Sequence, residues 1–426
     1  KYDGRNRTLL FGAYEGTRVR KGITQLTTVP SAELRSGNLS SIGTVRDPLT
    51  GQPFPNNTIP SNRINPITAA ILNQYVPLPN STRVFNWIST DPQRINVGQY
   101  NWRIDHRFSE SDSIFGHYIF EDTDFRYPRL FPTDGASQKF RGQNALVSWT
   151  HLIGANAVND FRVGFSRFIQ NEFQARAGKV NVVRELGMEG LCEIPSCWGI
   201  PQMNVTGFAS FGEHGGQSVS GPRAWRNEAY QWQDSFYYTR GSHSIKFGAI
   251  ARRHRDNFPE AIYPRGVYGF NGFLTGQPFG DYLLGYPRNT LTSIDVFSPH
   301  FRYTVVEPWF QDDWRVTPEL TLNLGLRYEW AGRPLSKDNT ISTVIFDQNR
   351  ARLITARDPE GYPSALAYDD FNNFAPRIGF AWTPKFLGAK TVFRGAYGIF
   401  YQRELANTWV DLAINDPFIR QTNINL

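Results

Sequence analysis

Acidic and histidine side chains are the residues of this chain that could do chemistry, but they lack the spacing that catalysis or metal binding requires. The adjacent carboxylates Asp312-Asp313 and Asp369-Asp370 would point to opposite faces of a strand, so neither pair can flank one glycosidic bond. The histidines show no ligand pattern such as His-x-x-x-His, and the sequence contains no phosphate-binding glycine loop and no nucleophilic serine motif. We therefore predict no catalytic residue, no metal site and no cofactor.

The two cysteines predict a structural cross-link. Cys192 and Cys197 lie in a segment rich in proline and glycine. A zinc site would need a second cysteine pair or nearby histidines, which this segment lacks. A small disulfide in an oxidising compartment is favoured over two free thiols, and it would hold a loop in place.

The segment 302–332 shows which element must position the polar residues: a β-hairpin with one apolar and one polar face. On its second arm, polar or small residues alternate with an apolar set, which comprises Leu320, Leu322, Leu324, Leu326, Tyr328 and Trp330. Successive strand residues point to opposite faces, so one side of this arm is apolar and the other polar. An arm of about eleven residues has the length of a tilted strand that crosses a bilayer.

Composition excludes several classes of protein. The chain has 426 residues and a formal charge of +7, with 19% charged and 15% aromatic residues. No apolar run approaches the roughly eighteen residues of a membrane helix, whereas alternation dilutes the apolar residues of a membrane β-barrel. Lys and Arg are spread along the chain without a basic block, so nucleic acid is not an expected partner.

The connections between alternating segments are more informative than the segments. Alternation predicts about eleven strands, at 8–17, 98–108, 113–122, 142–152, 160–171, 227–239, 244–254, 302–316, 320–332, 373–384 and 391–402. Short connections near 109–112, 154–159, 240–243, 317–319 and 385–390 alternate with long ones near 18–97, 123–141, 172–226, 255–301 and 333–372. This pattern is typical of outer-membrane barrels, which have short periplasmic turns and long extracellular loops. The predicted fold class is all-β: an antiparallel transmembrane β-barrel, incomplete, with about eleven strands of a larger barrel.

Two arginines conflict with this pattern. Arg167 occupies one of the alternating positions that are otherwise apolar in its strand. Arg394 fits the alternation of 391–402 poorly. An arginine that faces lipid at mid-depth costs about 2–4 kcal/mol. Either a bulge shifts the register there, or these strands begin elsewhere.

The first long connection, 18–97, is predicted to be an ordered loop with a short helix near 66–75. Asn65 can cap this helix, and Pro66 suits its first position. The apolar face of the helix would comprise Ile67, Ala70, Ile71 and Tyr75.

The most specific motif of the chain lies at 47–66. It reads Asp47-Pro-Leu-Thr-Gly-Gln-Pro-Phe-Pro-Asn-Asn, followed by Ile59-Pro60 and Arg63-Ile64-Asn65-Pro66. Further motifs of the same kind are Phe11-Gly12-Ala13-Tyr14-Glu15-Gly16, Arg103-Ile104-Asp105-His106-Arg107-Phe108-Ser109, Phe310-Gln311-Asp312-Asp313-Trp314 and Leu324-Gly325-Leu326-Arg327-Tyr328-Glu329. With these motifs the chain resembles, over essentially its whole length, the TonB-dependent receptors of the Oar-like group.

The resemblance implies an outer-membrane barrel of about 22 or more strands behind an N-terminal plug. Residues 1–426 would then form roughly the first half of the barrel domain, without the plug, the TonB box and the closing strands. The implied function is energy-coupled uptake of a large or scarce solute (a peptide, a glycan or a metal chelate) across the bacterial outer membrane. The implied partners are outer-membrane lipid, this unknown solute, and the TonB–ExbB–ExbD system, which would act through the missing plug.

The candidate functional residues of such a barrel lie on its polar face and in its long loops. Side chains predicted to face the lumen are Arg103, Asp105, Arg107, Lys246, Asn323, Arg327, Glu329 and Arg377. They would either contact the solute or supply the ion pairs that hold a plug, and the second role is favoured. Aromatic residues in the loops could stack on a sugar or a peptide, or pack the loops against each other. These aromatics are Trp198, Trp225, Tyr263 and Tyr268.

Two alternative functions remain open from the sequence. One is a passive porin or adhesin barrel, which would lack a plug. The other is a soluble β-rich glycan-binding protein, in which the apolar strand faces would meet a second sheet of protein instead of lipid.

Overall fold

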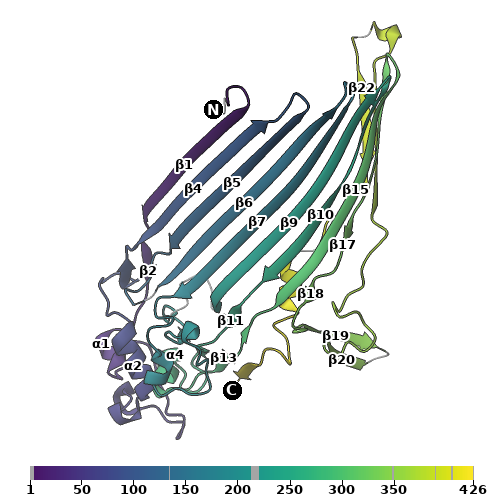
Figure 1. The fold of residues 1–426 in the computed structure, drawn as a ribbon. Coiled ribbons are helices and arrows are strands. Elements are labelled where there is room, and N and C mark those ends of the chain that lie inside the picture. The colour runs from purple at the N-terminus through teal and green to yellow at the C-terminus, as the bar shows by residue number, and fades with distance from the viewer. Residues whose placement is uncertain are drawn as a thin grey trace.

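The computed structural model describes residues 4–133, 135–212, 220–347, 350–388, 390–403 and 406–425. Its main feature is one large antiparallel sheet of long strands (Figure 1). The strands that follow one another across this sheet are β1 (Thr8–Gly22), β4 (Pro92–Arg107), β5 (Asp112–Arg126), β6 (Ala136–Ile153), β7 (Ala157–Gln174), β9 (Ser220–Arg240), β10 (His243–Asn257), β15 (His300–Thr317), β16 (Leu320–Tyr328), β21 (Phe374–Trp382) and β22 (Phe393–Gly398). Each strand pairs with the next strand in this order, as in a meander.

Shorter elements lie mainly in the long connections. The short strands β11 (Glu260–Ile262), β14 (Val296–Phe297), β17 (Trp330–Ala331) and β18 (Leu335–Ser336) extend the main sheet. Three smaller sheets comprise β2 (Gln25–Thr27) with β3 (Trp87–Ser89), β19 (Ser342–Asp347) with β20 (Arg350–Thr355), and β8 (Gln202–Val205) with β12 (Val267–Phe270), β13 (Asn289–Ser293) and β23 (Gln421–Asn425). The helices are α1 (Ala32–Arg35), α2 (Pro66–Tyr75), α3 (Val182–Glu185), α4 (Pro278–Leu284) and α5 (Ala406–Asp411), with 3₁₀ turns η1 (Pro55–Asn57), η2 (Ser61–Arg63), η3 (Pro195–Cys197) and η4 (Lys385–Leu387). None of the described helices has the length and apolar character needed to cross a membrane.

The register separates the main sheet into two faces. Residues directly opposite each other in antiparallel strands share a face. One row across neighbouring strands reads Trp102, Tyr118, Ala145, Phe165 and Tyr230. We call the side of this row the apolar face. The adjacent row, on the side that we call the polar face, reads Arg103, His117, Leu146, Gly164 and Gln231.

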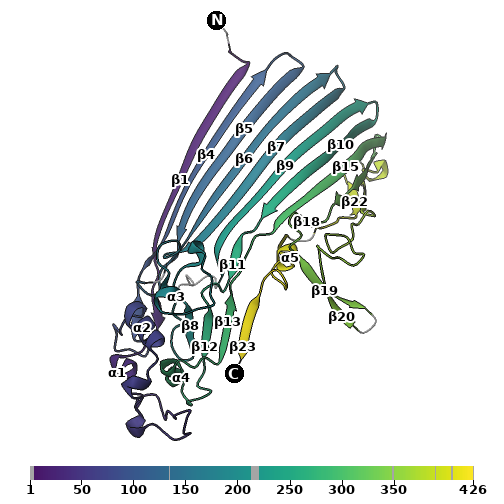
Figure 2. The same cartoon turned by 60° about the horizontal axis from the view of Figure 1, so that its bottom comes forward.

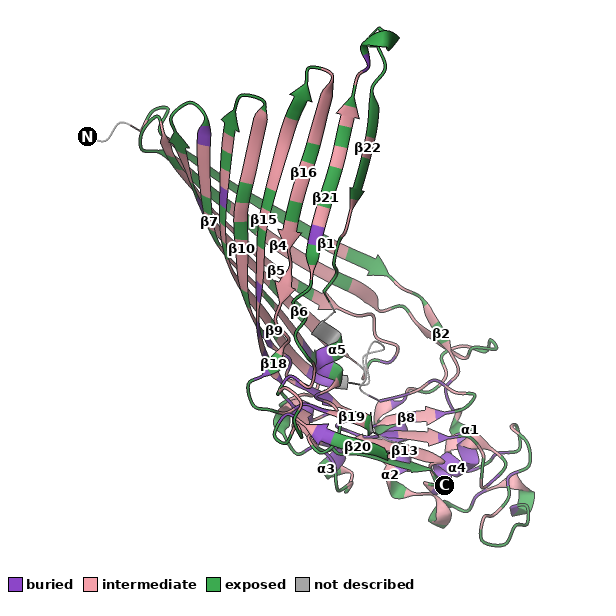
Figure 3. Cartoon of the chain, turned by 90° about the vertical axis from the view of Figure 1, so that its right-hand side faces the viewer, coloured by how far each residue is buried: buried purple, intermediate pink, exposed green. Residues whose placement is uncertain are grey.

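The apolar face leaves large hydrophobic side chains uncovered by protein. Leu10 is 78% exposed, Phe310 48% and Trp232 45%, and all three lie on this face by the register. A continuous uncovered surface of this kind must contact another apolar medium or partner. In Figure 3 the buried residues are instead concentrated among the small elements at the end of the sheet where the long connections lie.

The observed strand ends differ from those that the alternation predicts: most strands before β16 are longer than expected, whereas β16, β21 and β22 are shorter. β9 begins at Ser220, so the predicted start at 227 is wrong, and β1 continues to Gly22 beyond the predicted end at 17. The predicted strand 320–332 is interrupted, because β16 ends at Tyr328 and β17 begins at Trp330. Polar residues occupy both faces of the extensions, so alternation cannot mark where a strand ends.

The structure places Arg167 and Arg394 on different faces of the sheet. β7 pairs with both neighbours without a register shift, so the bulge considered for Arg167 is wrong. Arg167 lies on the apolar face directly beyond Phe165, and its Nε donates to Gln143 Oε1 at 2.8 Å. Arg394 lies on the polar face, because it pairs with Ala381 of β21, which in turn pairs with Thr321 of β16.

The long connections fold together at one end of the sheet (Figures 1 and 2). Buried side chains from 29–76, 131, 203–211 and 270–284 form one hydrophobic core, and we call these segments the loop unit. The fully buried Tyr282 in α4 donates its hydroxyl hydrogen to the backbone oxygen of Thr68 in α2 at 2.8 Å. Since these segments are distant in sequence, tertiary packing holds the unit together.

Helix α2 has the bounds expected from the sequence. The Asn65 side chain accepts hydrogen bonds from the backbone N–H groups of Ile67 and Thr68, which satisfies donors at the start of the helix. Ile71 and Leu72 are buried in the loop unit. Leu72 is absent from the predicted apolar face, because α2 packs against several segments and so buries a wider stripe.

Candidate functional site: the ion-pair network of the polar face

Glu307 is the centre of an ion-pair network on the polar face. Its Oε2 accepts from Arg252 Nη1 on β10 at 3.0 Å and from Arg327 Nη2 on β16 at 2.7 Å. Arg327 Nε also lies 3.2 Å from Glu329 Oε1. Glu307 itself is on β15, between the two strands that carry the arginines. The network therefore joins three neighbouring strands with charges that compensate each other.

A second cluster surrounds Asp313, nearer the short turns. Lys246 Nζ lies 2.9 Å from Asp313 Oδ2. Asn323 Nδ2 donates to Asp313 Oδ1 at 2.6 Å, and Gln311 Nε2 donates to the same oxygen at 3.0 Å. The carboxylate is thus held by neighbouring strands on both sides and by its own strand.

The predicted residues of β4 do not join these clusters. Arg103 and Asp105 form an ion pair with each other at 2.6 Å. Arg107 lies at the short turn after β4, where its Nε donates to the backbone oxygen of Ser109 at 3.1 Å. These side chains share the polar face, but β4 lies several strands away from Glu307.

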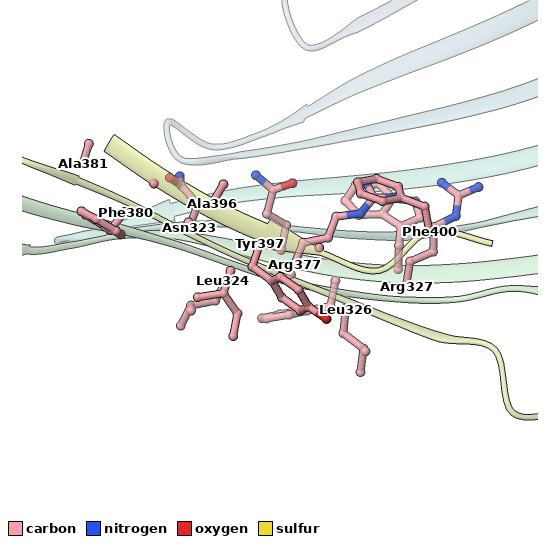
Figure 4. Close-up of a pocket in the computed structure, with 18 of the residues that line it drawn as sticks. Asn323, Leu324, Leu326, Arg327, Arg377, Phe380, Ala381, Ala396, Tyr397 and Phe400 are labelled. Atoms are coloured by element: carbon pink, nitrogen blue, oxygen red, sulfur yellow. The ribbon is translucent and has the colours of Figure 1, made fainter. Parts of the chain in front are cut away.

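Arg377 lies near the β22 end of the sheet. It is opposite Gly325, and its guanidinium lies 4.6 Å from the centre of the Phe400 ring. Figure 4 shows this region: Arg377 and Asn323 point to one side of the sheet, and Leu324 points to the other. The residues drawn in Figure 4 line a pocket at this end of the sheet. They belong to both faces of the sheet, so they do not form one binding site.

A pocket on the polar face connects the network to the loop end of the sheet. Its lining includes Arg252, Glu307 and Glu329 from the network, together with His254 and Tyr303. The His254 ring stacks on the Tyr303 ring with centroids 4.5 Å apart. Stacked rings beside paired charges can bind polar groups of a solute or of another protein segment.

Sequence reasoning placed Lys246, Asn323, Arg327 and Glu329 among the candidates but omitted the residues that bring them together. Those central residues are Arg252, Glu307 and Asp313. They share the polar parity of their strands, which is the signal that could have identified them. Their central position follows from the register between strands, which a single sequence does not reveal.

Two of the four candidate aromatics pack against other side chains of the protein. Trp225 lies in β9 and packs edge-on against Phe258 with centroids 5.4 Å apart, so the prediction that it lies in a loop is wrong. Tyr268 in β12 packs against the core of the loop unit, and this burial raises its pKa to about 12. Both side chains stabilise protein packing.

The other two candidate aromatics are half-buried in connections. Trp198 follows η3, and its Nε1 donates to the backbone oxygen of Glu193 at 3.2 Å. Tyr263 follows β11 and has a positive φ of 48°. The four aromatics lie in the main sheet, in the loop unit and in separate connections. They therefore do not form one surface on which a sugar or peptide could stack.

Cys192 and Cys197 are joined by a disulfide, with Cα atoms 6.1 Å apart. Both are buried together with Ala261 in a small cluster. Among the residues that the structure describes, no group of three His, Cys, Asp or Glu side chains is arranged to hold a metal ion. Asp312 and Asp313 have different surroundings, because Asp312 lies on the apolar face with His243.

The chain belongs to a family of outer-membrane proteins. Residues 4–426 match the model of a family described as "Outer membrane beta barrel domain". This membership places the protein in the bacterial outer membrane. A comparison with curated protein sequences found no match.

One of three similar solved structures reaches a TM-score of 0.50, at low sequence identity. The outer membrane transporter YddB from Escherichia coli is 10% identical, with a TM-score of 0.50 over 97% of this chain and 40% of that chain. The ferric-catecholate import receptor Fiu from Escherichia coli K12 is 10% identical, with a TM-score of 0.37 over 88% of this chain and 47% of that one. For the alcaligin outer membrane receptor FauA from Bordetella pertussis the values are 7% identity, a TM-score of 0.36 and coverage of 69% and 35%. The chain thus spans about half or less of the length of these proteins.

Proposed function

We propose that this chain forms part of the barrel of a TonB-dependent outer-membrane transporter of the Oar-like kind. The observation that carries this proposal is the contrast between the two faces of the sheet. One face exposes Leu10, Trp232 and Phe310, and the other face carries the Glu307 network. In an outer-membrane barrel the first face contacts lipid and the second lines the lumen.

The polar face suits a plugged lumen. Glu307 and Asp313 are fully paired within the wall, so a solute would have to compete with existing ion pairs for them. A plug domain needs a polar wall on which it can rest and from which it can be released. We therefore assign the wall network to barrel stability and plug contact, and solute capture to the loops.

The long connections would then face outward, and the short turns would face the periplasm. The loop unit has its own core, which includes Leu39, Ile59 and Phe279, so it presents a preformed surface to a solute. A large or scarce solute such as a peptide, a glycan or a metal chelate would be captured there. The TonB–ExbB–ExbD system would then open the lumen through the plug, at the expense of proton-motive force.

Uptake profiling of a deletion strain tests this function. Cells with and without the intact gene would be supplied with labelled peptides, glycans and metal chelates, and uptake would be followed with and without a protonophore. We expect uptake of one solute class to require both the gene and the proton-motive force. Uptake that persists after the protonophore, together with open-channel conductance of the pure protein in bilayers, would support a passive porin instead. The soluble alternative is excluded by the family membership.

A further inference from the structure

A second pocket lies on the polar face, toward the end of the sheet that carries the long connections. Its volume is about 560 Å³, within the range of roughly 300–1,000 Å³ that is usual for small-molecule sites. Two rows of residues across β6, β7 and β9 form its floor, and they comprise Asn144, Ser166, Ala229, Gly142, Phe168 and Asn227. We call this the wall pocket, and from its lining we propose that it binds a neutral oligosaccharide.

The wall pocket contains neutral polar groups that the protein leaves free. Among the residues that the structure describes, Ser166 has no hydrogen-bond partner, and Asn144 is contacted only at Oδ1, by His117 Nε2 at 3.1 Å. His254, which also lines the pocket, has a buried Nε2 without a partner. Sugar hydroxyls both donate and accept hydrogen bonds, so they can satisfy an amide, a hydroxyl and an imidazole side by side.

Phe168 supplies an aromatic surface beside these polar groups. It is 44% exposed and lines the pocket. Its ring stacks on Phe140 with centroids 6.0 Å apart and an angle of 22° between the planes, so the ring is held in place before a ligand arrives. A fixed aromatic ring next to a few polar groups suits a sugar, which has both C–H faces and hydroxyl edges.

The charges of the wall pocket do not favour an anionic metal chelate. Its carboxylates are Glu121 on β5 and Asp256 on β10, and its cation on the polar face is Arg403. Arg167 and Glu228 also belong to the lining, but the register places their side chains on the apolar face. Without an excess of positive charge, the pocket lacks the complementarity that an anionic ligand requires.

The wall beneath the pocket is also unsuited to an extended peptide. The strands β5, β6, β7, β9 and β10 are each paired with a neighbour on both sides. The wall therefore offers no free backbone edge, which is the feature that binds extended peptides through their main chain. Side-chain recognition of a hydroxyl-rich ligand remains.

The wall pocket continues into the pocket beside the Glu307 network. His254, Tyr303 and Arg403 line both pockets, and the second has a volume of about 510 Å³. It presents another aromatic ring, Tyr401, which is 40% exposed. Two adjoining pockets with one exposed ring each suit a linear chain of several sugar units better than a single sugar.

Titration calorimetry with the full-length protein in detergent tests the proposal. The probes are neutral tetrasaccharides of glucose, xylose and mannose, with tetra-alanine and a ferric catecholate chelate for comparison. The first test variant is Gly142→Leu, because a Cβ there would lie 3.8 Å from its nearest neighbour, Glu121 Cβ, so the backbone can accept a side chain that fills the floor. Its matched control is Gly164→Leu on the polar face outside the pocket, where the nearest atom, Leu146 Cδ1, would lie 3.6 Å away. Heat-dependent gel mobility would confirm that each variant is folded.

We expect at least one tetrasaccharide to bind, and Gly142→Leu to weaken its binding about tenfold because the new side chain occupies the space of the ligand. Phe168→Ala should weaken binding about fivefold. Its matched control is Phe11→Ala, a 59% exposed phenylalanine on the polar face of β1, and both controls should bind like the wild type.

Three results would overturn the proposal. The first is that no tetrasaccharide binds at millimolar concentration. The second is equal binding by Gly142→Leu and Gly164→Leu, which would place the sugar elsewhere. The third is that the peptide or the chelate binds instead and is the ligand that Gly142→Leu displaces.

This inference rests on the proposed function, in which the polar face lines the lumen and the loops capture the solute first. The two experiments can nevertheless fail separately. Energy-dependent uptake of a peptide or chelate without sugar binding would keep the transport function and remove the oligosaccharide site. Sugar binding in the wall pocket without energy-dependent uptake would keep the site and remove the energy coupling.

Discussion

Glu307 accepts hydrogen bonds from arginines on both neighbouring strands, so its loss should affect more than one contact. We expect Glu307→Gln to lower the free energy of unfolding by about 1–3 kcal/mol, because it leaves two half-buried guanidiniums without their shared carboxylate. Urea unfolding in lipid vesicles, followed by tryptophan fluorescence, measures this change.

The matched control is Glu15→Gln, an exposed glutamate on the polar face of β1. This substitution should change stability by less than about 0.5 kcal/mol. Similar losses in the two variants would show that the Glu307 network contributes nothing specific.

Asp91 gives a pH-dependent prediction in the loops. Arg129 lies 3.1 Å from its carboxylate. Burial alone would raise the pKa of Asp91, but hydrogen bonds from Arg129 and the nearby positive charge lower it below the usual value. A lowered pKa in the folded state stabilises the fold above the unfolded-state pKa of about 3.9, and this stabilisation is lost as the pH falls through the folded-state pKa.

We therefore expect Asp91→Asn to be less stable than the wild type near neutral pH and to approach it in acid. Denaturant unfolding at about pH 7 and about pH 3 would measure the difference in free energy. A difference that is constant over this range would contradict the role given to the carboxylate charge.

At the scale of the strand, neighbouring residues should respond in opposite ways to the same substitution. Leu324 lies on the apolar face of β16, and Asn323 lies on the polar face beside Asp313. Leu324→Arg should cost about 2–4 kcal/mol in a bilayer, because the charge would face lipid. Asn323→Arg is the control, since its charge would meet a carboxylate. Refolding into lipid vesicles measures both, and equal losses would argue against lipid on the Leu324 side.

Alternation predicted the strands where one face is apolar, because hydrophobic burial imposes a period of two there. It failed before residue 227 on β9, because Arg226 and Glu228 place charged side chains on the apolar face there. The central roles of Glu307 and Arg252 were missed because they depend on register, which a single sequence does not specify. The loop unit was missed because Ile71 and Phe279 meet only through tertiary packing.

At the scale of the whole molecule, the arrangement of short turns and long connections predicts which residues are accessible from outside the cell. Thr82 lies exposed in the first long connection, and Ser242 lies exposed in a short turn. We expect Thr82→Cys, but not Ser242→Cys, to react with a membrane-impermeant maleimide on intact cells. Labelling of both after the outer membrane is permeabilised is the control. The opposite labelling pattern would reverse the proposed orientation.

The hydrogen bond between Tyr282 and Thr68 joins residues separated by 214 positions. During synthesis and export, Leu39, Ile59 and Ile71 therefore emerge long before the residues that cover them. Contacts of such sequence separation form slowly, and uncovered apolar segments aggregate while they wait. We expect the polypeptide to need an escorting chaperone during its passage through the periplasm, for the sake of its loops as much as for its membrane strands.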